Sequence, residues 1–272
     1  MTVALGVLSL VLGTVYVGYG VITIVDLRRG WSEQGLSHFG LAWVCMAFTC
    51  GPHHLEHGLH LLLADRAGGG LELLAVAVGA PAGIIWFLLR VEATVGGRGD
   101  RFVSGTPAWL RALPWISAGY AVLMVGGLGA TAVVRGVTWR STLAPNLLLV
   151  VLYGLIGWYL LRTQLHNRGP LGGWSVSGLS LTAVFPTCAV MHGAWVVYAL
   201  TGRYELEPHG MIIDWLAVPA AFYFLWVVRS LHMGAGGVGG WNEGSRGVLP
   251  DVAPALAVPP ARGPAEYESA PL

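Results

Sequence analysis

The chain contains no lysine, because all fifteen of its basic residues are arginine. A retinal chromophore bound as a Schiff base needs a lysine amine, so that class of seven-helix protein is excluded. Charged residues of both signs make up only 11% of the 272 residues, against about 25% in a typical soluble domain. The formal net charge is +1, which gives no broad attraction for nucleic acid, and we expect no nucleic-acid partner.

Cysteine is also scarce, and its three positions exclude a disulfide-stapled secreted domain. Cys45, Cys50 and Cys188 all lie within apolar segments. Hydrophobic residues, by contrast, make up 55% of the chain. This combination is typical of an integral membrane protein, and the lipid bilayer is its first expected partner.

Long apolar runs set the expected fold. A membrane-spanning helix needs roughly 20 mostly apolar residues. Seven segments meet that length and predict an all-α polytopic membrane protein, a bundle of seven transmembrane helices within residues 1–233. The predicted segments are approximately Ala4–Val25, Ser37–Leu63, Leu71–Val91, Ala108–Val134, Leu143–Leu161, Trp174–Leu200 and Met211–Leu231.

The last part of the chain, residues 234–272, is rich in Gly, Pro and Ala and has few aromatics. This composition predicts a disordered tail. We expect a multi-pass protein of the cell membrane, and the sequence leaves open a homo-oligomer or a partner in a membrane complex.

Arginine positions predict how the bundle is oriented. Cytoplasmic loops of membrane proteins carry an excess of basic residues. In the seven-helix arrangement, eleven arginines fall on the side of the odd-numbered loops and the C-terminus, and four on the other side. The N-terminus is therefore predicted to lie outside, and the C-terminus and the tail in the cytoplasm.

The second predicted helix contains an unusual group of four histidines and one glutamate. Ionisable side chains at membrane depth are costly and usually serve a function. At 100° per residue, one helix face collects four of them, His53, Glu56, His57 and His60. His54 lies off that face, three residues before His57.

Gly51 and Pro52 interrupt this segment and leave two arrangements open. In the first, one kinked helix spans Ser37–Leu63. In the second, the span ends near Cys50 and the histidines form an amphipathic helix at the membrane surface. Both arrangements put the histidines toward the outer face.

The predicted topology brings ionisable groups from three other helices to the same outer end. Cys188 and His192 are four residues apart in the outer half of the sixth segment. Asp214 follows the start of the seventh, which opens near His209, and Glu72 starts the third. The sequence therefore predicts convergence of imidazole, thiol and carboxylate groups at one end of the bundle.

Such a set predicts a metal site in the outer leaflet. Its candidate ligands are His53, His54, His57, His60, His192 and Cys188, with Glu56, Glu72 and Asp214 as neighbouring carboxylates. A His/Cys/Met set suits copper or zinc, and a His/Glu set suits zinc or iron. Two histidines on different helices, such as His57 and His192, suit haem. The sequence therefore does not decide between copper, zinc, iron and haem.

Simpler structural roles stand beside this hypothesis. The histidines of the second segment also suit an interfacial helix or a proton-sensing role. His192 suits a hydrogen bond to a neighbouring helix, and Cys188 suits apolar packing.

Three functions follow from these alternatives. They are metal- or haem-dependent redox chemistry near the outer face, transport or handling of a metal cation, and a structural or sensory subunit without cofactor. Whether the protein is an enzyme is left open.

Two short patterns resemble motifs of known membrane families. His53, His54 and His57 are similar, in reverse order, to the His-x-x-His-His boxes of membrane desaturases. Met191 and His192 resemble the Met-His pairs of the copper-binding MHYT sensor domains. By contrast, His209 and His232, which flank the seventh segment, are too far apart for the His-x-x-x-His motif of the zinc hydrolases related to ceramidases. Each resemblance covers a single motif, so the chain is assigned to no family.

Overall fold

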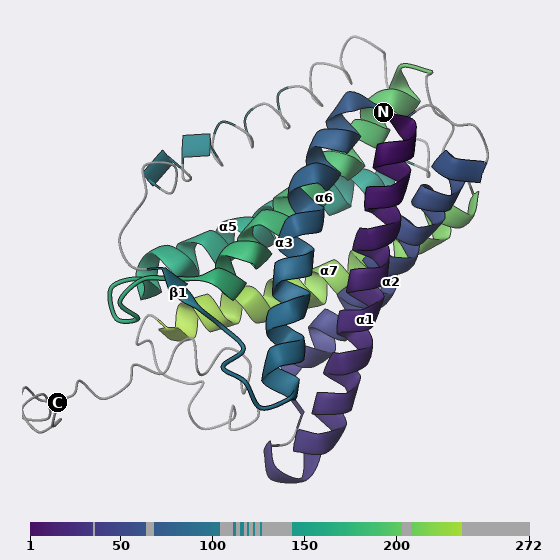
Figure 1. Cartoon of the computed structure of the whole chain (residues 1–272). Coiled ribbons are helices and arrows are strands. Elements are labelled where there is room, and N and C mark those ends of the chain that lie inside the picture. Colours follow the sequence, from purple (N-terminus) through teal and green to yellow (C-terminus); the bar gives the residue numbers. More distant parts are fainter. Residues whose placement is uncertain are drawn as a thin grey trace, which may run out of the picture.

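The computed structural model describes residues 1–34, 36–63, 68–103, 143–202 and 208–235, and the isolated positions 111–112, 115–116, 119, 122 and 126. Within these residues the chain forms six helices and one two-stranded antiparallel sheet, which confirms the all-α prediction (Figure 1). The elements are α1 (Thr2–Gln34), α2 (His38–Leu63), α3 (Gly70–Thr94), β1 (Phe102–Val103), α5 (Ala144–Asn167), β2 (Trp174–Ser175), α6 (Val176–Leu200) and α7 (Pro208–Ala235).

Six of the seven predicted helices correspond to these elements. The fourth, Ala108–Val134, lies outside the described residues apart from isolated positions. The predicted tail also lies outside them, except for its first two residues, which end α7.

Five of the described helices are long and apolar enough to cross a bilayer, so the protein is a multi-pass membrane protein by helix composition. The helix α2 is not among them, because its histidines lower its hydropathy. The five stretches are Thr2–Ser32, Gly70–Thr94, Ala144–Asn167, Val176–Leu200 and Ile212–Met233.

Two helices, α1 and α2, bear on the sequence prediction of helix bounds. The helix α1 continues to Gln34, beyond the predicted end at Val25, because residues such as Leu27, Arg28 and Arg29 favour a helix although two of them are charged. The helix α2 runs without a break through Pro52, which supports the single-helix arrangement. Proline removes one backbone hydrogen bond, and membrane helices tolerate that loss where neighbouring helices pack closely.

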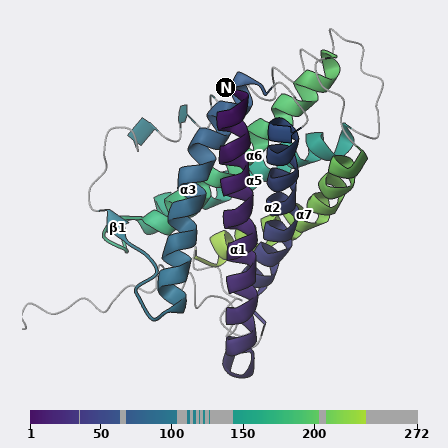
Figure 2. The ribbon, with the colours of Figure 1, turned by 45° about the vertical axis from the view of Figure 1, so that its right-hand side comes forward.

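The six helices pack as a closed ring. Around the ring, α1 packs on α2, α2 on α7, α7 on α5, α5 on α6, α6 on α3, and α3 back on α1. Figures 1 and 2 show α1, α2 and α3 standing side by side, while α5, α6 and α7 cross behind them at an angle.

Glycines set the close approach of α1 and α2. A Cβ on Gly13 would lie 2.8 Å from the backbone oxygen of Gly51, and a Cβ on Gly58 would lie 2.9 Å from that of Gly6. Small residues let membrane helices approach at this distance. The crossing fixes the histidine-bearing half of α2 against α1, and so it determines which side chains of α2 face the centre of the ring.

Neighbouring elements of the ring meet at two opposite ends of the bundle. At the end that we call the histidine end, the second half of α2 and the end of α6 meet the starts of α3, α5 and α7, through His53, Glu72, Asn146, His192 and Asp214. At the opposite end, the arginine end, the ends of α1, α3, α5 and α7 meet the starts of α2 and α6. Thus α1, α3, α5 and α7 run in one direction, and α2 and α6 in the other.

Between the two ends the centre of the ring is filled with aromatic side chains. Trp43 of α2 is 2% exposed, and its ring centroid lies 4.0 Å from that of Trp86 on α3. It also contacts rings from α1, α6 and α7, which are Tyr16, Tyr19, Phe185 and Phe224. This aromatic centre separates the histidine end from the arginine end.

Candidate functional site

Asp214, about two turns into α7, is the centre of the polar network at the histidine end. Its side chain is nearly fully buried, and one oxygen, Oδ1, lies 2.9 Å from His53 Nδ1 and 3.8 Å from His192 Nδ1. The other oxygen, Oδ2, accepts a 2.7 Å hydrogen bond from Asn146 Nδ2. A buried carboxylate needs such partners, and Asp214 draws them from α2, α5 and α6.

The network determines which ring nitrogens carry protons. A carboxylate oxygen only accepts hydrogen bonds, so the amide of Asn146 turns Nδ2 toward Asp214. Its Oδ1 then faces His192 Nδ1 at 2.7 Å, and an amide oxygen also only accepts. Neutral His192 therefore carries its proton on Nδ1 and a lone pair on Nε2.

His53 has the same tautomer in its neutral form, because its Nδ1 faces the Asp214 carboxylate. Among the described residues, neither His53 Nε2 nor His192 Nε2 makes a hydrogen bond. The two ring centroids lie 5.6 Å apart. Two imidazole lone pairs are thus presented from facing helices.

A small cavity of about 10 Å³ lies beside these rings, between α2, α5, α6 and α7. That is close to the least space that holds one water molecule or ion. Its lining residues include three histidines, two cysteines and one methionine: His53, His54, His192, Cys50, Cys188 and Met191. The cavity therefore combines nitrogen donors with soft sulfur donors.

His54 carries an unsatisfied buried atom at this cavity. Its side chain is 5% exposed, and its Nδ1 is buried without a hydrogen-bond partner among the described residues. The ring packs against Tyr16 with centroids 5.6 Å apart. A buried polar atom without a partner costs free energy, and a bound ion or water would remove that cost.

Both cavity thiols are free and paired with tyrosines. Cys50 Sγ lies 3.1 Å from the hydroxyl of Tyr153 on α5, and Cys188 Sγ lies 3.7 Å from the hydroxyl of Tyr16 on α1. Each thiol is thus positioned by a hydroxyl from another helix.

Trp195 of α6 is in contact with the rings of three histidines. It stacks on His53 with centroids 4.5 Å apart and meets His57 and His192 edge-on at 5.2 and 5.0 Å. Its indole N–H donates a 2.5 Å hydrogen bond to Glu72 Oε1. The indole therefore fixes the orientation of the imidazoles and joins α6 to α3.

Glu72 has a structural role at the start of α3. Its Oε2 accepts a 2.7 Å hydrogen bond from the backbone N–H of Gly69, the residue that caps the helix. His57 Nε2 lies 3.7 Å from Oε1, so this carboxylate also faces α2. Both oxygens of Glu72 are therefore hydrogen-bonded, one to the backbone of Gly69 and the other to Trp195, and Glu72 does not line the cavity.

Glu56 and His60 pair with each other at the edge of the bundle. His60 Nδ1 lies 3.2 Å from Glu56 Oε1, and both side chains are partly exposed. The helix face predicted from sequence is thus divided in the structure. His53 and His57 face the interior, Glu56 and His60 lie outside the cavity, and His54 lines it.

The remaining histidines lie elsewhere. His38 shares a 2.8 Å hydrogen bond with Tyr223, and His232 lies 3.3 Å from Thr163, both at the arginine end. His166 is exposed at that end, and the side chain of His209 lies outside the described ones.

The sequence prediction left out four side chains of this cluster: Asn146, Trp195, Tyr153 and Cys50. Asn146 had a visible signal, since it is an amide at the start of a strongly apolar segment. The other three looked like ordinary membrane-helix residues, and only the packing of the helices reveals their contacts.

Within the described residues, no three His, Cys, Asp or Glu side chains are already gathered as a metal-binding group. Comparisons of the chain with protein-family models, with curated proteins and with solved structures gave no match. The geometry of the cluster itself is therefore the basis for assigning its chemistry.

Proposed function

We propose that this multi-pass membrane protein binds a single thiophilic metal ion, with copper the best fit, in the cavity between α2 and α6. The observation that carries the proposal is the donor set of that cavity, which combines imidazole, thiol and thioether groups around space for one ion. Copper(I) prefers soft sulfur ligands together with imidazole. The bound metal would supply one-electron redox chemistry.

The proposed ligands are His192, His54, Cys50 and Cys188, with His53 as a further nitrogen donor. The lone pair on His192 Nε2 and the unsatisfied Nδ1 of His54 supply nitrogen donors. Asp214 and Asn146 hold the imidazoles in the tautomer that ligation requires, which is the usual role of carboxylates and amides behind metal-bound histidines.

The size of the cavity favours an ion over haem. About 10 Å³ admits one small particle, whereas haem is a large planar group that would have to separate the helices. His57, the other candidate axial ligand, faces Glu72 rather than the cavity.

Transport of a cation through the bundle is less well supported. The aromatic centre around Trp43 fills the space between the two ends. Within the described part of the chain, this centre offers a cation no row of polar groups along which to pass.

We further propose that the histidine end faces outward and that the protein resides in the cell membrane. The arginine end carries Arg28, Arg29, Arg162, Arg168 and Arg229, which indicates the cytoplasmic side. Since α1 begins at the histidine end and α7 ends at the arginine end, this orientation puts the N-terminus outside and the end of α7 inside.

The test compares two histidine variants for copper(I) binding in purified full-length protein, using competition with a chromophoric chelator. His192→Ala is expected to weaken binding by roughly 10-fold or more, because it removes one nitrogen ligand. His166→Ala, which changes an exposed histidine at the arginine end, is the matched control and is expected to bind as the wild type does. Equal affinity in all three proteins would show that the cavity is not the binding site.

A further inference from the structure

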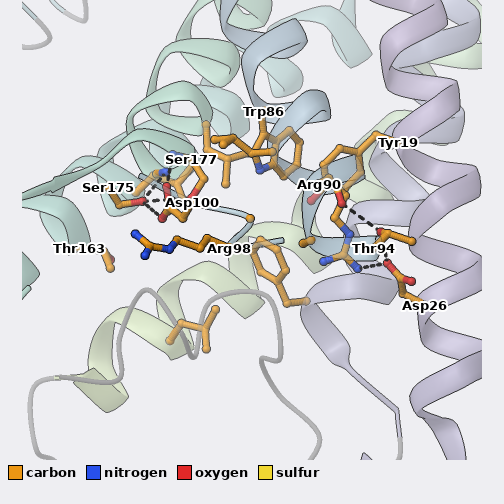
Figure 3. Close-up of a pocket in the computed structure, with 18 of the residues that line it drawn as sticks. Tyr19, Asp26, Trp86, Arg90, Thr94, Arg98, Asp100, Thr163, Ser175 and Ser177 are labelled. Carbon is orange, nitrogen blue, oxygen red and sulfur yellow. Dashed lines mark hydrogen bonds and ion pairs between the residues drawn. The ribbon is translucent and has the colours of Figure 1, made fainter. Parts of the chain in front are cut away.

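A second, much larger pocket lies at the arginine end, on the other side of the aromatic centre. Its volume is about 480 Å³, which is within the range of small-molecule sites. Residues of all six described helices line it, and Figure 3 shows several of them around the pocket.

Arginine is prominent on its wall. Arg90 is buried and paired with Asp26 at 2.8 Å, so this charge is already balanced. The guanidinium of Arg98 points into the pocket in Figure 3 and forms no ion pair among the described residues. Glu92, which accepts a 3.3 Å hydrogen bond from the backbone N–H of Arg98, forms its ion pair with Arg101 at 2.9 Å. Arg29 adds a second cation without an acidic partner in the described part of the chain.

The other carboxylate on the wall, Asp100, is occupied in fixing the pocket. It accepts hydrogen bonds from the hydroxyls of Ser175 and Ser177 at 2.6 and 2.9 Å, and from the backbone N–H of Ser177 at 3.0 Å. These bonds anchor the segment after α3 to the start of α6, as Figure 3 shows. The charge of Asp100 is thereby dispersed, and Arg98 is left as an available cation.

A buried amide gives independent evidence for a ligand. Asn167, at the end of α5, is 8% exposed and lines the pocket. Its amide nitrogen is buried without a hydrogen-bond partner among the described residues. Buried amides are normally satisfied, so this donor points to an acceptor that enters the pocket.

The deep wall of the pocket is apolar and aromatic. Tyr19 and Trp86 stack there with ring centroids 3.9 Å apart, next to Phe39, Leu181 and Val228. Such a wall accepts an apolar body and gives no favourable partner to a small hydrated ion.

We propose that this pocket binds an amphipathic organic anion. Its apolar body packs against Trp86 and Leu181, and its anionic group meets Arg98, with the amide of Asn167 donating a hydrogen bond to it. A fatty carboxylate from the aqueous side and the anionic headgroup of a membrane lipid share this chemistry. The inference is independent of the metal proposed at the opposite end.

The test measures binding of radiolabelled dodecanoate to the full chain in nanodiscs of phosphatidylcholine, with empty nanodiscs subtracted. The methyl ester of dodecanoate, which has the same chain but no charge, is the control ligand. Saturable binding of the acid is expected, with the ester bound roughly 10-fold more weakly, because charged hydrogen bonds at a partly buried site are worth about that factor. Arg98→Ala and Asn167→Leu are each expected to lower affinity for the acid by roughly 10-fold.

Arg229→Ala is the matched control, because Arg229 is exposed at the same end and does not line the pocket. It is expected to leave affinity within roughly twofold of the wild type, the usual effect of an exposed charge. Circular dichroism of each variant checks the fold.

A second arm adds phosphatidylglycerol to the nanodiscs. Competition that depends on Arg98 identifies a lipid headgroup as the source of the anion, and its absence identifies a soluble carboxylate. The proposal is overturned if acid and ester bind equally, if Arg98→Ala and Arg229→Ala have the same effect, or if the acid shows no saturable binding.

Discussion

Asn146 donates a 2.7 Å hydrogen bond from Nδ2 to Asp214 Oδ2, and this bond determines which way its amide faces. With the nitrogen turned to Asp214, the amide oxygen meets His192 Nδ1 at 2.7 Å. One carboxylate on α7 thus controls the tautomer of a histidine on α6 through an amide on α5.

The first prediction changes that carboxylate. Asp214→Asn removes the obligate acceptor, so the amide of Asn146 is free to turn and the tautomer of His192 is no longer fixed. Copper(I) affinity is expected to fall by roughly 10- to 100-fold, the usual effect of losing a group behind a metal-bound histidine.

Glu56→Gln serves as the control, because it alters a carboxylate on α2 that pairs with His60 at the edge of the bundle. It is expected to leave copper affinity unchanged. If Glu56→Gln weakens binding as much as Asp214→Asn does, the assigned network is wrong.

A second prediction compares two cysteines on the same helix. Cys50 lines the cavity, whereas Cys45 does not. Cys50→Ala is expected to reduce affinity for copper(I) by at least roughly 10-fold, because a thiolate is a preferred ligand of copper(I). Cys45→Ala is expected to have no effect, and chelator competition with copper(I) measures the difference.

A third prediction concerns the crossing of α1 and α2. A Cβ added by Gly13→Ala meets backbone atoms of α2 at 2.8 Å, which a side-chain rotation cannot relieve. The variant is expected to lower the free energy of unfolding by about 1–3 kcal/mol, the usual cost of overpacking. Because α1 holds the histidine-bearing half of α2, copper affinity is expected to fall as well.

Gly154→Ala is the control for this effect. A Cβ at Gly154 meets nothing within 4 Å, so alanine is expected to be neutral or to stabilise α5 by up to about 1 kcal/mol. Unfolding in mixed detergent micelles measures both variants. A Gly13→Ala protein as stable as Gly154→Ala would show that the two helices do not pack this closely.

A fourth prediction concerns orientation. Fusing a reporter that is active only in the cytoplasm after Leu272 is expected to give signal, because eleven of the fifteen arginines lie on that side of the topology predicted from the sequence. The same reporter inserted after Gly202, which follows α6 at the histidine end, is expected to be silent. The reverse pattern would place the histidine end in the cytoplasm.

Much of the fold could be predicted from sequence, because apolar runs of sufficient length have few alternatives in a membrane protein. Boundaries were less predictable. The helix α1 passes Val25 because helix formation does not require apolar side chains, and hydropathy alone leaves out α2 because of its histidines.

The convergence of His53, His192 and Asp214 was foreseen from topology alone, and the structure brings them within contact distance. The inward position of His54 was not foreseen. A helical wheel assigns a face but not its direction, and the packing of Gly51 against Gly13 sets how α2 is turned. Asn146 and Trp195 were missed for the same reason, since their roles depend on neighbours from other helices.

The most direct measurement is the metal content and X-ray absorption spectrum of the wild-type chain purified in nanodiscs and loaded with copper(I). The account predicts about one copper ion per chain, with both imidazole nitrogen and sulfur scatterers in its coordination sphere. A folded chain that retains no copper, or retains it with oxygen ligands alone, would contradict it.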